Sequence, residues 1–177
     1  MVYDIISRNS IIGRQMVFMA NGVIRSNLST HDYRENVYLE YSMNSLKPLK
    51  SFYYRSSPVK SDYSTCLYCN SSIRTNCNGK EKNAWFNGVL FDNIQIMFQL
   101  PRIYELTNSR YARFKTMNVF APYFSEVFRI VVTEVRQCNE RKCYQIRSPL
   151  EALFFYDNEE ILLSCKTGEL SYCLVAK

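Results

Sequence analysis

Asn-Gly pairs between short apolar segments place the strongest constraint on how this chain can fold. Asn21-Gly22 lies between the apolar segment 15–20 and the segment 23–25. Both residues can adopt the positive φ angles of a type I′ turn, which joins two antiparallel strands closely. The spacing therefore predicts a hairpin over residues 14–26. Asn87-Gly88 repeats the device between residues 84–86 and 89–91, which predicts a second hairpin.

Alternating apolar and polar residues predict further strands. The segments 36–43 and 94–100 both have a period of two, and the second would complete a meander ended by Pro101. Two hairpins are predicted near the C-terminus, one from residues 127–137 and 143–146, the other from 161–165 and 170–175.

One short helix is predicted near residues 149–156. Ser148-Pro149-Leu150-Glu151 has a Ser N-cap, a Pro at the first helical position and a Glu at N3, the residues of a capping box. We therefore predict a mainly β fold, an antiparallel β-sandwich or partly open barrel of about eight to ten strands, with a jelly-roll variant as one form. The alternative is an α+β fold in which residues 102–117 form a second helix.

The composition agrees with a sheet-rich single domain over residues 1–177. Apolar residues make up 47% of the chain and aromatic residues 15%, and the 14 Tyr and 11 Phe favour half-buried pleated surfaces. Two stretches, about 45–64 and 70–83, lack periodicity and are predicted to be long loops. Long loops in a compact domain are often binding segments.

The N-terminal residues do not resemble a signal peptide, because Asp4 and Arg8 interrupt the first ten positions. No apolar run approaches the roughly 20 residues that span a bilayer. We expect an intracellular protein, cytoplasmic or nuclear, that is not inserted in a membrane and keeps its 7 Cys reduced.

Three of these cysteines form a candidate zinc site. Cys66 and Cys69 have the C-x2-C spacing of a zinc knuckle, and Cys77 follows eight residues later. The fourth ligand is missing from the local sequence. We therefore expect no cofactor, keep a structural zinc ion as a hypothesis, and interpret the three side chains first as ordinary thiols.

Basic and aromatic residues alternate in two segments, a pattern that suits single-stranded nucleic acid because cations contact phosphates while rings stack on bases. The net charge of the chain is +6, and its basic excess lies in residues 1–124, which carry +7 against −1 for residues 125–177. The candidate binding residues are Lys50, Tyr53, Tyr54 and Arg55 in the first segment, and Arg110, Tyr111, Arg113 and Lys115 in the second.

No catalytic motif is present, so we name no catalytic residue and predict that the chain is not an enzyme. The leading hypothesis is a non-enzymatic interaction or assembly protein that binds another protein or copies of itself, because Tyr and Arg are enriched at interfaces. The abundance of Asn, Tyr and Ile suits an AT-rich genome, and so a viral origin. The alternatives are an RNA- or single-stranded-DNA-binding protein and, third, a thiol or zinc-dependent enzyme.

Overall fold

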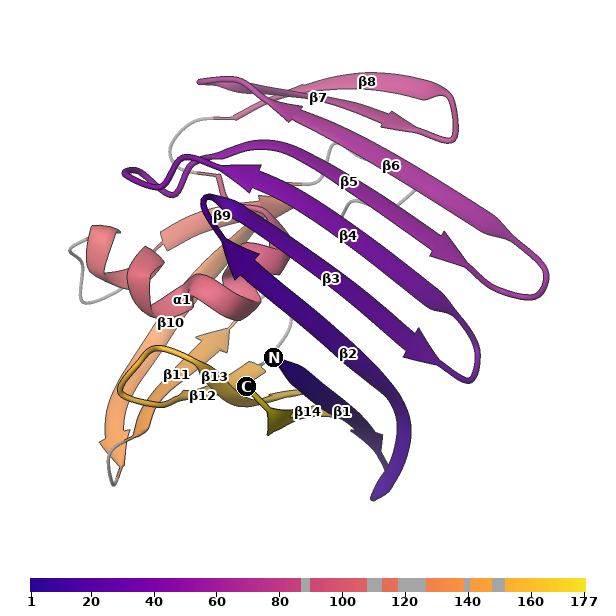
Figure 1. The fold of residues 1–177 in the computed structure, drawn as a ribbon. Coiled ribbons are helices and arrows are strands. Elements are labelled where there is room, and N and C mark those ends of the chain that lie inside the picture. The colour runs from indigo at the N-terminus through magenta and orange to yellow at the C-terminus, as the bar shows by residue number, and fades with distance from the viewer. Residues whose placement is uncertain (87–89, 108–112, 118–126, 139–140, 148–151) are drawn as a thin grey trace.

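A computed structural model describes residues 1–86, 90–107, 113–117, 127–138, 141–147 and 152–177. Within these residues, one antiparallel sheet of fourteen strands curls around a single helix (Figure 1). The elements are β1 Val2–Ser7, β2 Ser10–Ala20, β3 Val23–Thr30, β4 Arg34–Tyr41, β5 Pro48–Ser56, β6 Ser61–Tyr68, β7 Ser72–Cys77, β8 Lys80–Trp85, α1 Asn93–Thr107, β9 Arg113–Met117, β10 Val127–Cys138, β11 Arg141–Arg147, β12 Ala152–Tyr156, β13 Leu162–Thr167 and β14 Leu170–Ala176.

The strands follow one another as a continuous meander, in the order β8 to β1 and then β14 to β9. The first and last strands therefore pair in the middle of the sheet, with Val2 opposite Ala176. The outermost strands are β8 and β9, which flank α1 in the sequence. The predicted antiparallel, mainly β class is confirmed, and the open, barrel-like form is the one observed.

The predicted hairpin at Asn21-Gly22 is confirmed. Asn21 has φ 50° and Gly22 has φ 73°, as a type I′ turn requires. A Cβ atom on Gly22 would lie 2.7 Å from the backbone oxygen of Tyr41, so both the conformation and the space demand glycine. The hairpins β10–β11 and β13–β14 also lie where the sequence predicts them. The Asn87-Gly88 turn lies outside the described residues.

Four predictions about secondary structure are wrong. The sheet has fourteen strands instead of about eight to ten. Residues 94–100 belong to α1 instead of a strand, and Pro101 lies inside that helix. Residues 152–156 form strand β12 instead of the predicted short helix, with Ala152, Phe154 and Tyr156 buried in alternation. The predicted loops 45–64 and 70–83 consist largely of β5, β6, β7 and β8.

Residues 94–100 show the period of two expected of a strand although they form a helix, because this helix is buried on several sides. Ile94, Ile96, Phe98 and Leu100 are buried, but Gln95 and Gln99 between them are buried as well. Gln95 donates hydrogen bonds to the Leu46 backbone oxygen at 2.9 Å and to the Gln99 side chain at 3.1 Å. An apolar residue at every second position therefore does not indicate one exposed face here.

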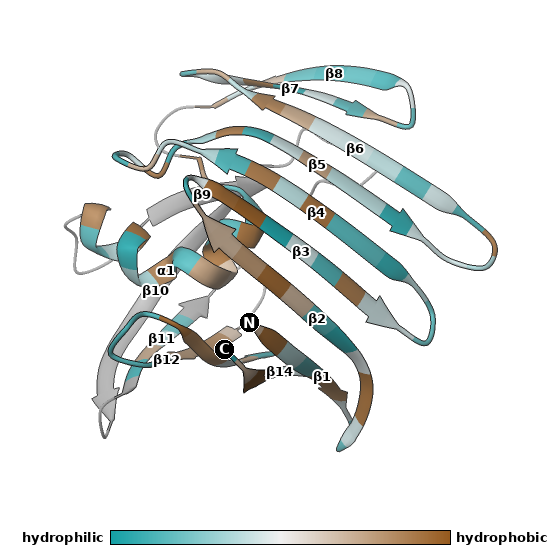
Figure 2. Cartoon of the chain, in the orientation of Figure 1, coloured by the Kyte–Doolittle hydropathy of each residue, from teal (hydrophilic) through white to brown (hydrophobic). Residues whose placement is uncertain are grey.

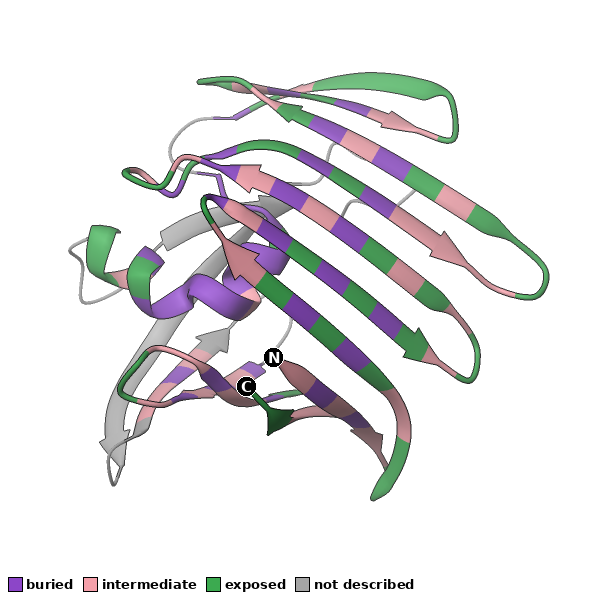
Figure 3. Cartoon of the chain, in the orientation of Figure 1, coloured by how far each residue is buried: buried purple, intermediate pink, exposed green. Residues whose placement is uncertain are grey.

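The two predicted loops were misread because small polar residues occupy inward positions of their strands. Ser51, Ser64 and Thr75 are at most 1% exposed and face the helix side of the sheet. Figure 3 shows the regular alternation of buried and exposed residues along β2 to β6.

Among the described residues, no helix is both long and apolar enough to cross a membrane.

Pro101 leaves the carbonyl oxygen of Met97 without its usual helical donor, because proline has no backbone N–H. The hydroxyl of Tyr156, on β12, donates a hydrogen bond to that oxygen at 2.7 Å. The Tyr156 ring packs edge-on against Tyr144, with ring centroids 5.6 Å apart. The proline is therefore compatible with a buried helix because the sheet supplies the missing donor.

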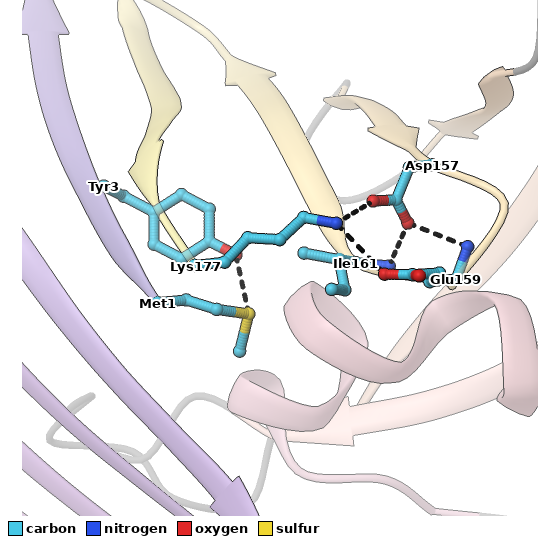
Figure 4. A network of polar contacts seen from close by, with 6 residues as sticks. All are labelled: Met1, Tyr3, Asp157, Glu159, Ile161 and Lys177. Carbon is cyan, nitrogen blue, oxygen red and sulfur yellow. Dashed lines mark hydrogen bonds and ion pairs between the residues drawn. The ribbon is translucent and has the colours of Figure 1, made fainter.

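Near the chain ends, Lys177 contacts the β12–β13 turn (Figure 4). Its Nζ lies 2.9 Å from Asp157 Oδ2 and 3.1 Å from Glu159 Oε2, while Asp157 Oδ1 accepts the backbone N–H of Ile161 at 2.8 Å. Partial burial by itself would raise the pKa of Asp157, but these hydrogen bonds outweigh burial and lower that pKa.

The lowered pKa of Asp157 predicts a loss of stability in acid. A depressed native pKa contributes stability above the unfolded value, and this stability is lost as the pH falls through the native value. The difference in free energy of unfolding between the wild type and Asp157→Asn should therefore shrink between about pH 5 and about pH 2. Urea denaturation across this range measures it. Glu169→Gln, in a more exposed ion pair with Arg8, is the control, and an equal effect there would contradict the assignment.

Candidate functional site

A buried polar cluster lies beneath the N-terminus of α1. The carboxylate of Asp92 accepts hydrogen bonds from the hydroxyls of Tyr53, on β5, and Tyr68, on β6. It also accepts the backbone N–H of Ile94 at 3.1 Å, while the Gln95 side chain accepts the backbone N–H of Asp92 at 3.2 Å. These reciprocal bonds are a capping box, so the same carboxylate begins the helix and attaches it to the sheet.

The groups around Asp92 are held in their protonated forms. Burial, with the negative charge of Asp92 as a second cause, raises the pKa of both Tyr53 and Tyr68. The same two causes raise the pKa of Cys66 to about 12. A thiol with so high a pKa is a poor nucleophile. With Asp92 and Cys66 at most 1% exposed, the cluster is suited to holding the helix in place rather than to acting on a substrate.

The three cysteines of the zinc hypothesis are not gathered in one place. Cys66 is buried on the helix side of β6, and Cys77 lies on β7 opposite Ser64. Cys69 is exposed in the turn beyond β6. Across the described part of the chain, no three His, Cys, Asp or Glu side chains are grouped as metal ligands. Zinc binding stays a prediction without a geometric site to support it.

The outer face of β2–β6, on the side away from α1, carries a row of large exposed side chains. Phe18 on β2 lies opposite Arg25 on β3, which lies opposite Tyr38 on β4, which lies opposite Phe52 on β5. We call Phe18, Arg25, Tyr38 and Phe52 the outer aromatic row. Phe18 is 59% exposed and Phe52 is 37% exposed. Phe18 and Phe52 stand at the two ends of this row, and large apolar side chains exposed to solvent on one face are typical of a contact surface.

Contacts within the outer aromatic row fix its centre. The Arg25 guanidinium lies over the Tyr38 ring, 5.5 Å from its centroid, and the Tyr38 hydroxyl donates to Glu40 at 2.7 Å. Met16 on the same strand as Phe18, and Tyr63 and Leu67 on β6, extend the apolar surface and are 40–54% exposed. The row is thus an ordered part of a larger apolar patch.

Two cations border this patch. Lys50 on β5 lies opposite Glu40 on one side and Leu67 on the other, and Arg74 on β7 lies opposite Leu67. Neither Lys50 nor Arg74 forms an ion pair with another described residue. The outer face therefore combines exposed rings with two cations that form no ion pair among the described residues.

The first predicted basic–aromatic segment is divided between the two faces of the sheet. Lys50 and Tyr54 lie on the outer face with Phe52. Tyr53 is 3% exposed and bonded to Asp92, so its ring is not available to stack on a base. Arg55 donates to Glu35 at 2.6 Å and lies 4.9 Å from the centre of the Tyr33 ring.

The second predicted segment is described only from Arg113 onward. Arg110 and Tyr111 are outside the described residues. Arg113 and Lys115 lie in β9, whose backbone pairs with β10.

Sequence reasoning missed Phe18 and Arg25. A signal for them existed, because Met16-Val17-Phe18-Met19 is apolar at every position of a strand that should have one wet face (Figure 2). The second apolar face of such a strand must be covered by something or stay exposed.

Comparison with known proteins identifies the fold and goes no further. No family model matches the sequence, and no curated protein matches it. The fold is similar to the crystal structure of a DUF1089 family protein from Pseudomonas aeruginosa, with a TM-score of 0.62 and 12% identity over 88% of this chain and 90% of that one. It is also similar to a β-barrel-like protein of the domain of unknown function DUF1849 from Brucella abortus, with a TM-score of 0.51 and 9% identity over 97% and 92% of the two chains.

Removing the Asp92 carboxylate should destabilise the protein strongly. Asp92→Ala leaves two tyrosine hydroxyls without their acceptor and removes the helix N-cap, so we expect a loss of about 3–5 kcal/mol. Tyr68→Phe removes the hydrogen bonds of one hydroxyl, to Asp92 and to Ser51, but keeps the helix N-cap, so it should cost about 1–2 kcal/mol. Tyr54→Phe, whose hydroxyl makes only a 3.4 Å exposed contact with Ser61, is the control and should change little. Urea denaturation measures all three.

Alkylation separates the cysteines and tests the zinc hypothesis. Cys69 is exposed and should react with iodoacetamide in the native protein, whereas Cys66, with its raised pKa and full burial, should react only after unfolding. Mass spectrometry of peptides after timed quenching gives the two rates. Protection of Cys69 that a chelator removes would instead support bound zinc.

Proposed function

We propose that this chain is a non-enzymatic binding protein that contacts a protein partner through the outer face of β2–β6. The observation that carries the proposal is the outer aromatic row, with Phe18 and Phe52 exposed to solvent at its two ends. Aromatic residues, Met and Arg are enriched in protein interfaces and supply most of their binding energy.

The shape and charge of this face indicate the chemistry of the partner. The sheet curls around α1, so its outer face is convex (Figure 1). A flat rigid surface would touch such a face only along a strip, whereas an extended segment or a concave surface could follow it. Because Lys50 and Arg74 border the patch, the partner should place acidic residues around an apolar centre.

Association through the edge strand β8 is less well supported than association through the face. Lys80, Glu81 and Lys82 are all exposed on β8. Charged residues on an edge strand oppose pairing with another chain. A self-associating protein would therefore also use the outer aromatic row.

Site-specific photo-crosslinking tests the proposal. Benzoylphenylalanine in place of Phe52 should give a discrete adduct with one protein in the source cell, or with a second copy of the chain. Phe18→Ser should reduce this adduct at least about tenfold, since an aromatic hot-spot residue contributes roughly 2 kcal/mol or more.

Val59→Ser is the matched control, because Val59 is 94% exposed but lies in the β5–β6 turn, and it should leave the adduct unchanged. A second probe, benzoylphenylalanine in place of Val59, tests for non-specific capture. If it gave the same adduct as the probe at position 52, the result would contradict the proposal. Light scattering over a concentration series separates self-association from a different partner.

A second candidate function, binding of single-stranded nucleic acid, is favoured by one observation. Lys50, Phe52 and Tyr54 alternate along β5 on its outer face, and Arg25 on β3 and Arg74 on β7 lie two strands away on either side. Exposed rings beside unpaired cations on a sheet can stack bases and contact phosphates.

Fluorescence anisotropy with a labelled single-stranded oligonucleotide tests this second function. Binding should weaken steeply with salt, Phe52→Ala should reduce affinity about tenfold, and Arg74→Gln should reduce the salt slope by about one. An absence of binding at about 50 mM salt would exclude it.

A further inference from the structure

An open pocket of about 320 Å³ with a mixed polar and apolar lining lies between the β3–β4 and β5–β6 turns, at one end of the outer face. It is separate from the outer aromatic row. The residues used below that line it are Ser29, His31, Asp32, Arg34, Ser56 and Pro58.

Both turns that wall the pocket are held by their own hydrogen bonds. Thr30 Oγ1 accepts the backbone N–H groups of Asp32 at 3.2 Å and Tyr33 at 3.1 Å. In the other turn, Ser57 Oγ accepts the backbone N–H of Lys60 at 3.1 Å, and the Ser57 N–H donates to the Lys60 oxygen at 2.8 Å. The pocket is therefore formed before any ligand binds, which lowers the entropy lost on binding.

Arg34 lies between two hydroxyl-bearing residues on the neighbouring strands. The register places Ser29 on β3 opposite Arg34 on β4, and Arg34 opposite Ser56 on β5. Neighbouring strands are about 4.8 Å apart, so Arg34 lies one strand spacing from each serine, and the two serines flank it about 9.6 Å from each other. Arg34 is exposed and forms no ion pair with another described residue.

This row has the chemistry of an oxyanion site. The planar guanidinium of arginine can donate two parallel hydrogen bonds to a phosphate. The two serine hydroxyls can donate to the remaining oxygens, and the His31 ring adds a further donor at the rim. By contrast, the nearby Arg55 is already engaged with Glu35 and Tyr33. Of these two arginines, Arg34 is the one free to bind a ligand.

The volume and the one carboxylate of the pocket indicate the rest of the ligand. A bare phosphate would fill only part of a pocket whose volume is at the lower end of small-molecule sites, which span about 300–1,000 Å³. Asp32 repels an anion but accepts hydrogen bonds from hydroxyl groups. Pro58 offers an apolar side to a carbon skeleton.

We propose that this pocket binds a small phosphate monoester that carries hydroxyl groups, as a sugar phosphate does. The phosphoryl group lies on Arg34 between Ser29 and Ser56, and the ligand hydroxyls donate to Asp32.

Titration followed by two-dimensional NMR tests this site, with inorganic phosphate, glucose 6-phosphate and glucose as probes. Glucose 6-phosphate should shift the amide resonances of residues 29–34 and 56–58 and bind more tightly than inorganic phosphate, whereas glucose should not bind. Arg34→Gln should weaken glucose 6-phosphate binding at least about tenfold, because charge-assisted hydrogen bonds are lost.

Two further variants make the outcome decisive. Arg74→Gln removes another exposed, unpaired arginine and should leave binding unchanged; equal weakening by Arg74→Gln and Arg34→Gln would mean general attraction to a basic protein and overturn the proposal. Asp32→Asn should tighten binding of inorganic phosphate and reduce the advantage of glucose 6-phosphate over it. Resonances unchanged by glucose 6-phosphate at about 10 mM, a concentration that reveals even millimolar affinity, would also overturn it.

Discussion

Tyrosine hydroxyls that bind α1 determine how the rest of the sheet can be arranged. Tyr53 and Tyr68 donate to Asp92 from β5 and β6, and Tyr156 donates to the Met97 oxygen from β12. These strands lie on opposite sides of the central β1–β14 pair. The helix is therefore attached to both halves of a sheet whose described edges, β8 and β9, are not paired with each other. Its position fixes the curvature, and the curvature makes the outer face convex.

The sequence was informative where a local rule determines the structure. The positive φ angles at Asn21-Gly22 require no tertiary partner, and the hairpins β10–β11 and β13–β14 have regular apolar patterns with short turns. The alternation of apolar and polar residues does not reveal the correct element where the buried residues are polar. Ser51, Ser64 and Thr75 are buried on strands, and Gln95 and Gln99 are buried on the helix.

The helix itself had a readable start. Asp92-Asn93-Ile94-Gln95 has an N-cap Asp and an N3 Gln, which form the capping box observed. Residues 148–151 carry a similar signal, but the segment that follows them pairs with neighbouring strands on both sides. Capping residues permit a helix, but the aromatic residues at 154–156 also suit a central strand, and pairing decided between the two.

The candidate surfaces could be predicted only in part, because register brings their residues together. Lys50 and Tyr54 were identified from the basic–aromatic pattern, but a strand separates its neighbours, so Tyr53 and Arg55 point to the other face. The outer aromatic row joins residues from four strands. The proposed oxyanion site joins Ser29, Arg34 and Ser56 from three strands. No sequence spacing encodes such rows until strand pairing is known.

The pairing of β1 with β14 also affects how the protein is made. During synthesis β1 to β8 emerge in order, and each can pair with the strand before it as a local hairpin. The free edge of β1 has no such neighbour, because Val2 must wait for Ala176. Until then β1 presents an open edge through which nascent chains could pair with one another. Closing this seam is the most non-local event in the folding of the sheet, and local pairing is faster than non-local pairing. The seam is therefore the step at which a chaperone, or a competing chain, would have the longest time to act.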